Sequence, residues 1–92
     1  MHEEAMVRDV IRKAEEVARR EGAGRVTRVR LWVGARSHLD GPELKARWAY
    51  AVRGTALDGA EVVVESSRER GDPNAELVML RSLDVDSREE RR

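Results

Sequence analysis

The chain contains no cysteine, and this absence removes several classes of function at once. Among its 92 residues there is no disulfide, no thiolate metal ligand and no cysteine nucleophile. The chain also lacks net charge, because 18 Lys and Arg balance 18 Asp and Glu. A general attraction to nucleic acid or to an anionic membrane is therefore not indicated.

Long apolar runs are missing as well. No stretch reaches the length that spans a bilayer, and no apolar segment follows a basic start as in a secretory signal. We therefore expect a cytoplasmic protein without nucleic-acid or membrane partners. Apolar residues make up 40% of the chain and charged residues 39%, a balance typical of one small folded domain with a charged surface.

Catalytic constellations are also absent from the sequence. The only histidines are His2 and His38, and the glycines match neither phosphate-binding motif. No nucleophile can be grouped with a base and an orienting acid. The sequence therefore predicts a protein that is not an enzyme.

Apolar periodicity predicts a helix followed by a strand. Residues Glu4 to Glu21 carry apolar side chains at helical spacing, and Gly22 is placed to cap the C-terminus. Residues Val26 to Val33 alternate as in a strand with one face on the core. The expected core face holds Thr27, Val29, Leu31 and Val33, and the expected outer, basic face holds Arg28, Arg30 and Trp32.

A second helix and two more strands follow. Asp40 is a capping residue before Gly41-Pro42-Glu43, and the helix is expected to carry an apolar stripe and to end at Gly54. The strands are expected at Ala60–Glu65 and Glu76–Asp86, on either side of a polar loop, Ser66–Asn74. In the last strand the expected core face holds Leu77, Met79, Leu83 and Val85.

This order predicts an α+β fold of the sequence α-β-α-β-β, with two helices packed on one face of a three-stranded mixed β-sheet. The strand–helix–strand unit predicts a parallel pair with a right-handed crossover. The last two strands are expected to form a hairpin. We expect residues 1–86 to form a single αβ domain, and residues 87–92 to form a charged tail.

His2 is the residue with the clearest chemistry. The α-amine of Met1, the backbone nitrogen of His2 and its imidazole can close adjacent chelate rings around one metal. A deprotonated amide nitrogen suits square-planar Ni(II) or Cu(II). Binding is expected to weaken in acid, since protons compete for these ligands. The alternative is a terminus without a metal.

Several motifs, taken in order, resemble the HypA family of hydrogenase maturation nickel chaperones. The match begins with Met1-His2-Glu3 ahead of an amphipathic helix, and it covers most of the chain. The remaining segments that carry it are Glu15-Glu16, Arg25–Leu31, Val33-Gly34 with Arg36-Ser37, Asp40 before the second helix, Gly54-Thr55, Gly59–Glu61 and Leu80–Val85.

The resemblance implies a nickel metallochaperone that binds Ni(II) at its N-terminus and delivers it to a nickel enzyme. The target is NiFe hydrogenase and in some cases urease. The implied partners are a nickel-handling maturation GTPase and the hydrogenase large subunit or another nickel enzyme. The implied nickel ligands are Met1, His2 and Glu3, with Asp40 as a further candidate. An exposed sheet edge suggests a monomer or a weak homodimer.

Two departures from the family pattern are evident. The family inserts a zinc domain with two CxxC pairs between the last two strands, whereas this chain has only the Ser66–Asn74 loop and no cysteine. No zinc is therefore expected. Ala35 also replaces a glutamate that usually follows the glycine.

The missing zinc domain leaves two interpretations open. One is a nickel carrier without zinc. The other is a degenerate, metal-free adaptor module that binds the GTPase or another maturation protein, with Trp32 and the basic strand face as candidate contacts. His38 is either an additional imidazole ligand or a histidine on a surface loop.

Overall fold

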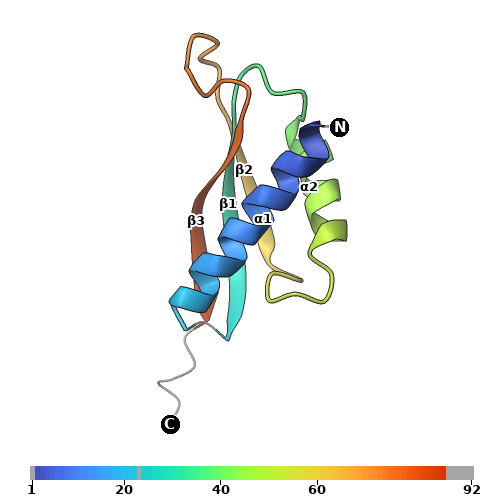
Figure 1. The fold of residues 1–92 in the computed structure, drawn as a ribbon, viewed down its shortest axis with the longest axis vertical. Coiled ribbons are helices and arrows are strands. Elements are labelled where there is room, and N and C mark those ends of the chain that lie inside the picture. Colours follow the sequence, from blue (N-terminus) through green and yellow to red (C-terminus); the bar gives the residue numbers. More distant parts are fainter. Residues whose placement is uncertain (1, 23, 87–92) are drawn as a thin grey trace.

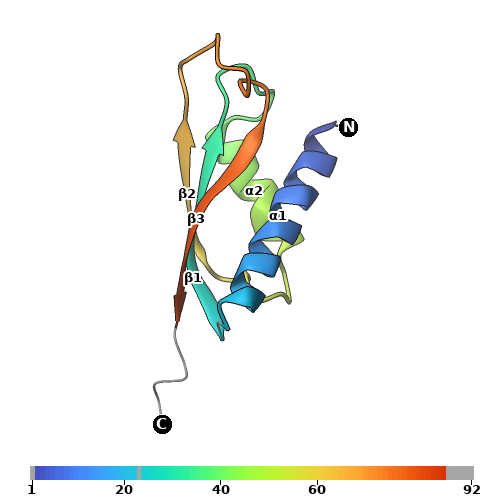
Figure 2. The same cartoon turned by 60° about the vertical axis from the view of Figure 1, so that its left-hand side comes forward.

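The computed structural model describes residues 2–22 and 24–86, with side chains from Glu4 onward. Its elements are α1 (His2–Arg20), β1 (Arg25–Val33), α2 (Gly41–Ala51), β2 (Glu61–Ser66) and β3 (Val78–Asp86), shown in Figure 1. Both helices lie on the same face of the three-stranded sheet (Figure 2). The predicted α+β fold is confirmed. The predicted tail, residues 87–92, lies outside the described residues, so the division at residue 86 stays a prediction.

The sheet has the strand order β2-β1-β3. β1 and β2 pair in parallel around α2, as the strand–helix–strand pattern predicted. The predicted hairpin between the last two strands is wrong, because β3 pairs antiparallel with β1. Val29 and Leu31 of β1 are 0% exposed, and a strand buried to this degree needs a neighbour on each side to pair its backbone groups. The 67–77 connection carries the chain from one side of β1 to the other.

A bulge in β3 changes which of its side chains face the core. Arg30 pairs with Ser82 and Leu31 with Leu80, so Arg81 is an extra residue in the ladder. Beyond such a residue the inward and outward positions are exchanged. The core therefore receives Val78 and Leu80 on one side of the bulge and Leu83 and Val85 on the other.

The predicted core face of the last strand was therefore right for Leu83 and Val85 and wrong for Leu77 and Met79. Leu77 precedes β3 and is 40% exposed. Met79 pairs with Trp32, which lies on the sheet face away from the helices.

A second bulge affects β1. Val26 pairs with Val85 and Arg28 with Asp84, which leaves Thr27 as the extra residue. Val26 is buried in its place, and Thr27 is exposed with its hydroxyl donating to the Asp84 carbonyl at 3.2 Å. The prediction that Thr27 faces the core was wrong for this reason.

The helices end at or near the predicted glycines. Gly22 follows α1 with φ 69°, a left-handed conformation that glycine adopts without strain, and its N–H donates to the Arg19 carbonyl. α2 ends at Ala51, earlier than predicted, with Val52 as the C-cap, and Gly54 lies in the turn beyond. Within residues 2–22 and 24–86, no helix combines the length and the apolar composition needed to cross a membrane.

The core lies between the helices and the inner face of the sheet. Its largest fully buried side chain is Trp48 of α2, which is 1% exposed. The other buried apolar residues of the core are Val7, Val10, Ile11, Ala14, Ala18, Val26, Val29, Leu31, Val33, Leu39, Leu44, Val52, Leu57 and Val78. Because both helices and β1 contribute to this cluster, it holds the start of α1 and the start of α2 in fixed positions on the sheet.

Candidate metal-binding end of the domain

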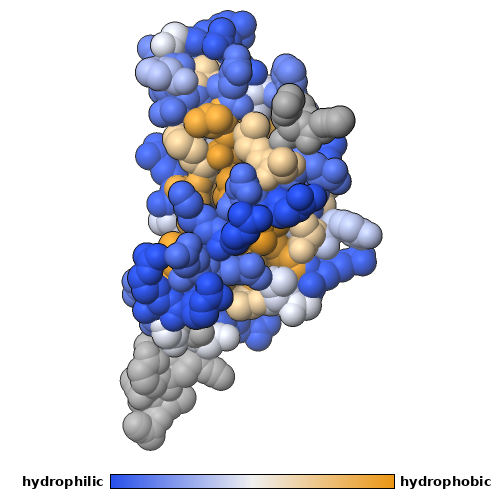
Figure 3. Space-filling view, in the orientation of Figure 1, coloured by the Kyte–Doolittle hydropathy of each residue, from blue (hydrophilic) through white to orange (hydrophobic). Residues whose placement is uncertain are grey.

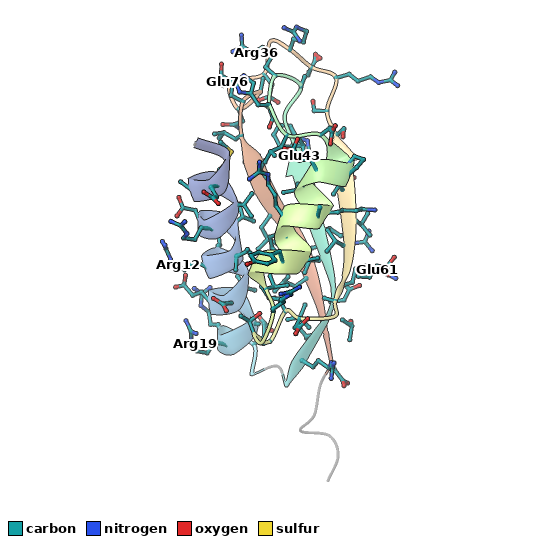
Figure 4. The ribbon with its side chains drawn as sticks, turned by 90° about the vertical axis from the view of Figure 1, so that its right-hand side faces the viewer. Arg12, Arg19, Arg36, Glu43, Glu61 and Glu76 are labelled. Carbon is teal, nitrogen blue, oxygen red and sulfur yellow. The ribbon has the colours of Figure 1, made fainter. Side chains whose placement is uncertain are left out.

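Two loops meet at the end of the domain where α1 begins (Figures 1 and 2). One loop links β1 to α2, and the other links β2 to β3. Their backbones are joined by two hydrogen bonds, from the Gly34 N–H to the Leu77 carbonyl at 2.9 Å and from the Arg36 N–H to the Ala75 carbonyl at 2.7 Å. Arg36 also pairs with Glu76 at 3.3 Å, and both residues are labelled at this end in Figure 4.

Gly34 is the residue that permits this close approach. A Cβ atom at position 34 would lie 2.2 Å from the Ala75 carbonyl oxygen, a backbone atom that cannot swing aside. Ala75 is itself buried, with 1% of its surface exposed. The small residue at position 34 therefore sets how the two loops are joined.

A hollow opens between these loops and the first turns of α1. Figure 3, which views the helical side of the molecule, shows a largely hydrophilic surface with apolar strips beside α1. The hollow is lined by Ala5, Met6 and Asp9 of α1, by Arg36, Ser37 and His38 of one loop, and by Glu76 and Leu77 of the other. His38 therefore shares a concave surface with α1, although His38 and Asp9 are 29 positions apart in the sequence.

The predicted nickel ligands fall into three groups. Met1 lies outside the described residues, and His2 and Glu3 are described only through their backbone, as the first residues of α1. Asp40 is the N-cap of α2, and its Oδ1 accepts a hydrogen bond from the Glu43 N–H at 2.8 Å. Among the described side chains, no three or more His, Asp or Glu residues gather as a metal site.

The predicted capping role of Asp40 is thus confirmed, and its predicted nickel role stays a prediction. In Figure 4, Glu43 marks the start of α2, which lies at the same end of the domain as the start of α1 and to its right. Asp40 does not line the hollow beside α1.

Replacing Asp40 with alanine is expected to lower the free energy of unfolding by about 1 kcal/mol, since the Glu43 N–H loses its acceptor. Asp40→Asn keeps a side-chain oxygen and is expected to lower it by a few tenths of a kcal/mol at most. Urea unfolding of the two variants checks this. Equal losses in both would mean that the charge of Asp40, and not the cap, is what stabilises the helix.

The outer face of the sheet is not the basic surface that β1 alone predicted. Arg28 lies between Glu61 of β2 and Asp84 of β3, with ion pairs of 3.1 and 3.3 Å. Arg81 pairs with Glu65 at 3.1 Å. Arg28 of β1 and Arg81 of β3 thus each have an acidic neighbour from another strand, so this face carries acidic side chains as well as basic ones. Trp32 lies half-buried on the same face.

Comparison with known proteins gives a consistent family. Residues 1–72 match the family model described as "Hydrogenase/urease nickel incorporation, metallochaperone, hypA". Proteins called hydrogenase maturation factor HypA are similar to this chain, with 37% identity over 71 residues for Chlorobaculum tepidum and 42% over 65 residues for Chlorobaculum parvum. These alignments cover 77% and 71% of this chain but only 63% and 58% of the relatives. The chain thus spans about three fifths of their length.

A solved structure supports the fold. The solution structure of the Ni metallochaperone HypA from Helicobacter pylori superposes with a TM-score of 0.74 at 14% identity, covering 89% of this chain and 95% of that one. At this identity the likeness concerns the fold alone.

The family match also bears on two features predicted from the sequence. It stops at residue 72, inside the 67–77 connection, where the resemblance places the zinc domain of the family. The family description names a metallochaperone, in agreement with the prediction that the chain is not an enzyme. Because the model match covers residues 1–72 of 92, the chain belongs to the HypA family of nickel-incorporation metallochaperones.

Proposed function

We propose that this chain is a cytoplasmic nickel metallochaperone that binds Ni(II) through Met1, His2 and Glu3 and delivers it during maturation of a nickel enzyme, NiFe hydrogenase or urease. The main support for the proposal is that α1 begins at His2 in a chain that belongs to this nickel-incorporation family. Nickel is the cargo, and no resident zinc is part of the proposal. The implied partners are the maturation GTPase and the hydrogenase large subunit or another nickel enzyme.

The start of a helix suits this chemistry. The first N–H groups of an α-helix have no acceptor within the helix, so the His2 amide can lose its proton to a metal without breaking a helical hydrogen bond. The positive end of the helix dipole also stabilises the resulting negative charge. Amide nitrogen, imidazole and primary amine together form a nitrogen-rich set that suits square-planar Ni(II).

The fourth ligand has two candidates. One is Glu3, through its backbone or its carboxylate. The other is Asp40, whose Oδ1 already accepts from the Glu43 N–H while its second oxygen has further acceptor capacity. Because Asp40→Asn keeps the cap and removes the charge, this variant separates nickel binding from helix stability. An unchanged nickel affinity in Asp40→Asn would exclude Asp40 from the fourth position.

The test is a calorimetric titration of Ni(II) into the chain with a free Met1 amine. His2→Ala is expected to weaken binding by about a hundredfold, because a direct ligand is lost and even outer-shell partners of metal sites contribute tenfold to a hundredfold. Affinity is also expected to fall as the pH is lowered, since amine, amide and imidazole bind only when deprotonated.

A matched control for that titration is Glu16→Ala, which removes an exposed charge of α1 remote from its first turn; Glu16 pairs with Arg20 at 3.3 Å near the opposite end of the helix. This variant is expected to bind nickel as the unmodified chain does. Equal nickel affinities for the unmodified chain and His2→Ala would refute the proposal.

A metal-free adaptor is the second candidate function. The outer face of the sheet supports this candidate as a surface for a partner protein. Neither helix covers that face (Figure 2), and the half-buried Trp32 lies on it. An adaptor would recover the maturation GTPase from solution equally with and without Ni(II), and Trp32→Ala would reduce the recovery. A nickel carrier would show recovery that changes with the metal.

A further inference from the structure

The hollow beside α1 places an imidazole near the helix start. His38 lines it from the β1–α2 loop, and Ala5, Met6 and Asp9 line it from α1. The hydrogen bonds between Gly34 and Leu77 and between Arg36 and Ala75 brace that loop. His38 is therefore held close to α1 by the fold and not by nearness in sequence.

Helical periodicity extends this face of α1 back to position 2. Residues three and four apart in a helix lie on the same side of it. Position 2 precedes Ala5 by three residues and Met6 by four, and α1 includes His2. The helix face that borders the hollow at Ala5 and Met6 therefore includes the position of His2.

We propose that His38 supplies a second imidazole to the nickel bound at the N-terminus, from across the hollow. This inference rests on the proposed function, since it adds a ligand to that same site. Imidazole is a good ligand for nickel. The proposal names His38, in preference to Asp40, as the side chain outside the first three residues that binds the metal.

The other lining groups are less suited to this role. Asp9 and Glu76 offer carboxylates, a ligand type that suits magnesium, calcium and manganese, whereas the imidazole of His38 suits nickel. Met6 packs partly against the core, and Asp40 does not line the hollow.

The proposal has a consequence for stability. A chelate made only from the first three residues is contiguous in sequence, so it forms in the unfolded chain as well as in the folded one. Such a site favours the folded state only through the helix start, whose dipole contributes less than a full ligand does. A site that includes His38 exists only when the fold brings the loop to α1, so nickel binding then stabilises the fold.

The test measures the Tm of the chain with a free Met1 amine, by circular dichroism with and without saturating NiCl2. If His38 strengthens binding in the folded state about tenfold, nickel raises the Tm by roughly 6 to 11 °C in a domain of this size. In His38→Gln the nickel-dependent rise is expected to shrink to the small part that the helix start provides, while nickel still binds about tenfold more weakly. X-ray absorption is expected to report two imidazoles in the unmodified chain and one in the variant.

Two further variants separate the possible failures. Glu76→Gln alters the same hollow and is expected to keep the nickel-dependent rise in Tm. His38→Asn removes the imidazole with a different residue, so a loss seen in both variants is not a folding defect caused by glutamine alone. An equal rise in the unmodified chain and both His38 variants overturns the role of His38, yet leaves the proposed function intact if His2→Ala loses binding. Undiminished binding in His2→Ala overturns the proposed function itself.

Discussion

A flexible extension of four residues ahead of Met1 is expected to lower the affinity for Ni(II) about a thousandfold, a larger loss than that from His2→Ala. The extension converts the Met1 amine into an ordinary amide, which removes the end group of the proposed chelate. What remains are the imidazole of His2 and the proposed imidazole of His38, as separate donors. Joining donors into one chelate raises affinity by roughly 10² to 10⁴ over separate donors, and the extension forfeits that gain.

The length of the extension matters for this experiment. A single added residue would put the histidine in third position behind a new amine, with two amides between them. Those four nitrogens can surround a square-planar metal by themselves, so a one-residue extension would create a different site. Four glycine and serine residues avoid this, and calorimetry against the unextended chain gives the comparison.

Acetylation of the Met1 amine during expression is the matched control, because it removes the same donor without adding residues. Both modified chains are expected to keep the Tm of the metal-free protein. Retention of full nickel affinity in either of them would place the nickel site elsewhere in the chain.

The sequence predicted the fold well where local pattern and core burial agree. The helix that became α1 carries apolar residues at regular helical spacing, and Gly22 and Asp40 have the conformations and contacts expected of caps. The parallel pairing of β1 and β2 follows from the α2 crossover, which leaves the chain few alternatives.

The errors arose where pairing between distant strands decides the outcome. Thr27 and Arg81 are extra residues in their ladders, and each exchanges the faces of the residues beyond it. Strict alternation along β3 therefore misplaced Leu77 and Met79. Nothing local to a strand reveals a bulge, since it depends on the register with the partner strand.

The candidate site was predicted only in part for a similar reason. His2 and Asp40 were predicted as ligands from residue chemistry near a helix start, and their nickel roles stay predictions. The hollow that brings His38 beside Met6 was not predicted, because it depends on two loops that join through backbone hydrogen bonds. The one local signal for it is Gly34, a small residue directly after a buried strand.

Gly34→Ala is accordingly expected to lower the free energy of unfolding by about 3 kcal/mol, at the upper end of the usual cost of overpacking. The added Cβ would lie 2.2 Å from the Ala75 carbonyl oxygen and 2.7 Å from that of Asn74. Backbone oxygens cannot rotate away, so the two loops must separate. For a 92-residue domain, whose stability is of the order of 5 to 14 kcal/mol, this loss is a large share and is measurable by urea unfolding.

Gly71→Ala is the matched control for this clash, because a Cβ at position 71 meets no atom within 4 Å and Gly71 is not among the glycines with positive φ. It is expected to leave stability unchanged or slightly raised, since alanine reduces the freedom of the unfolded chain. The separated loops of Gly34→Ala would also move His38 away from α1. The nickel-dependent rise in Tm is therefore expected to shrink in Gly34→Ala and to persist in Gly71→Ala. Equal stability of the two variants would show that the loop junction tolerates a side chain at position 34.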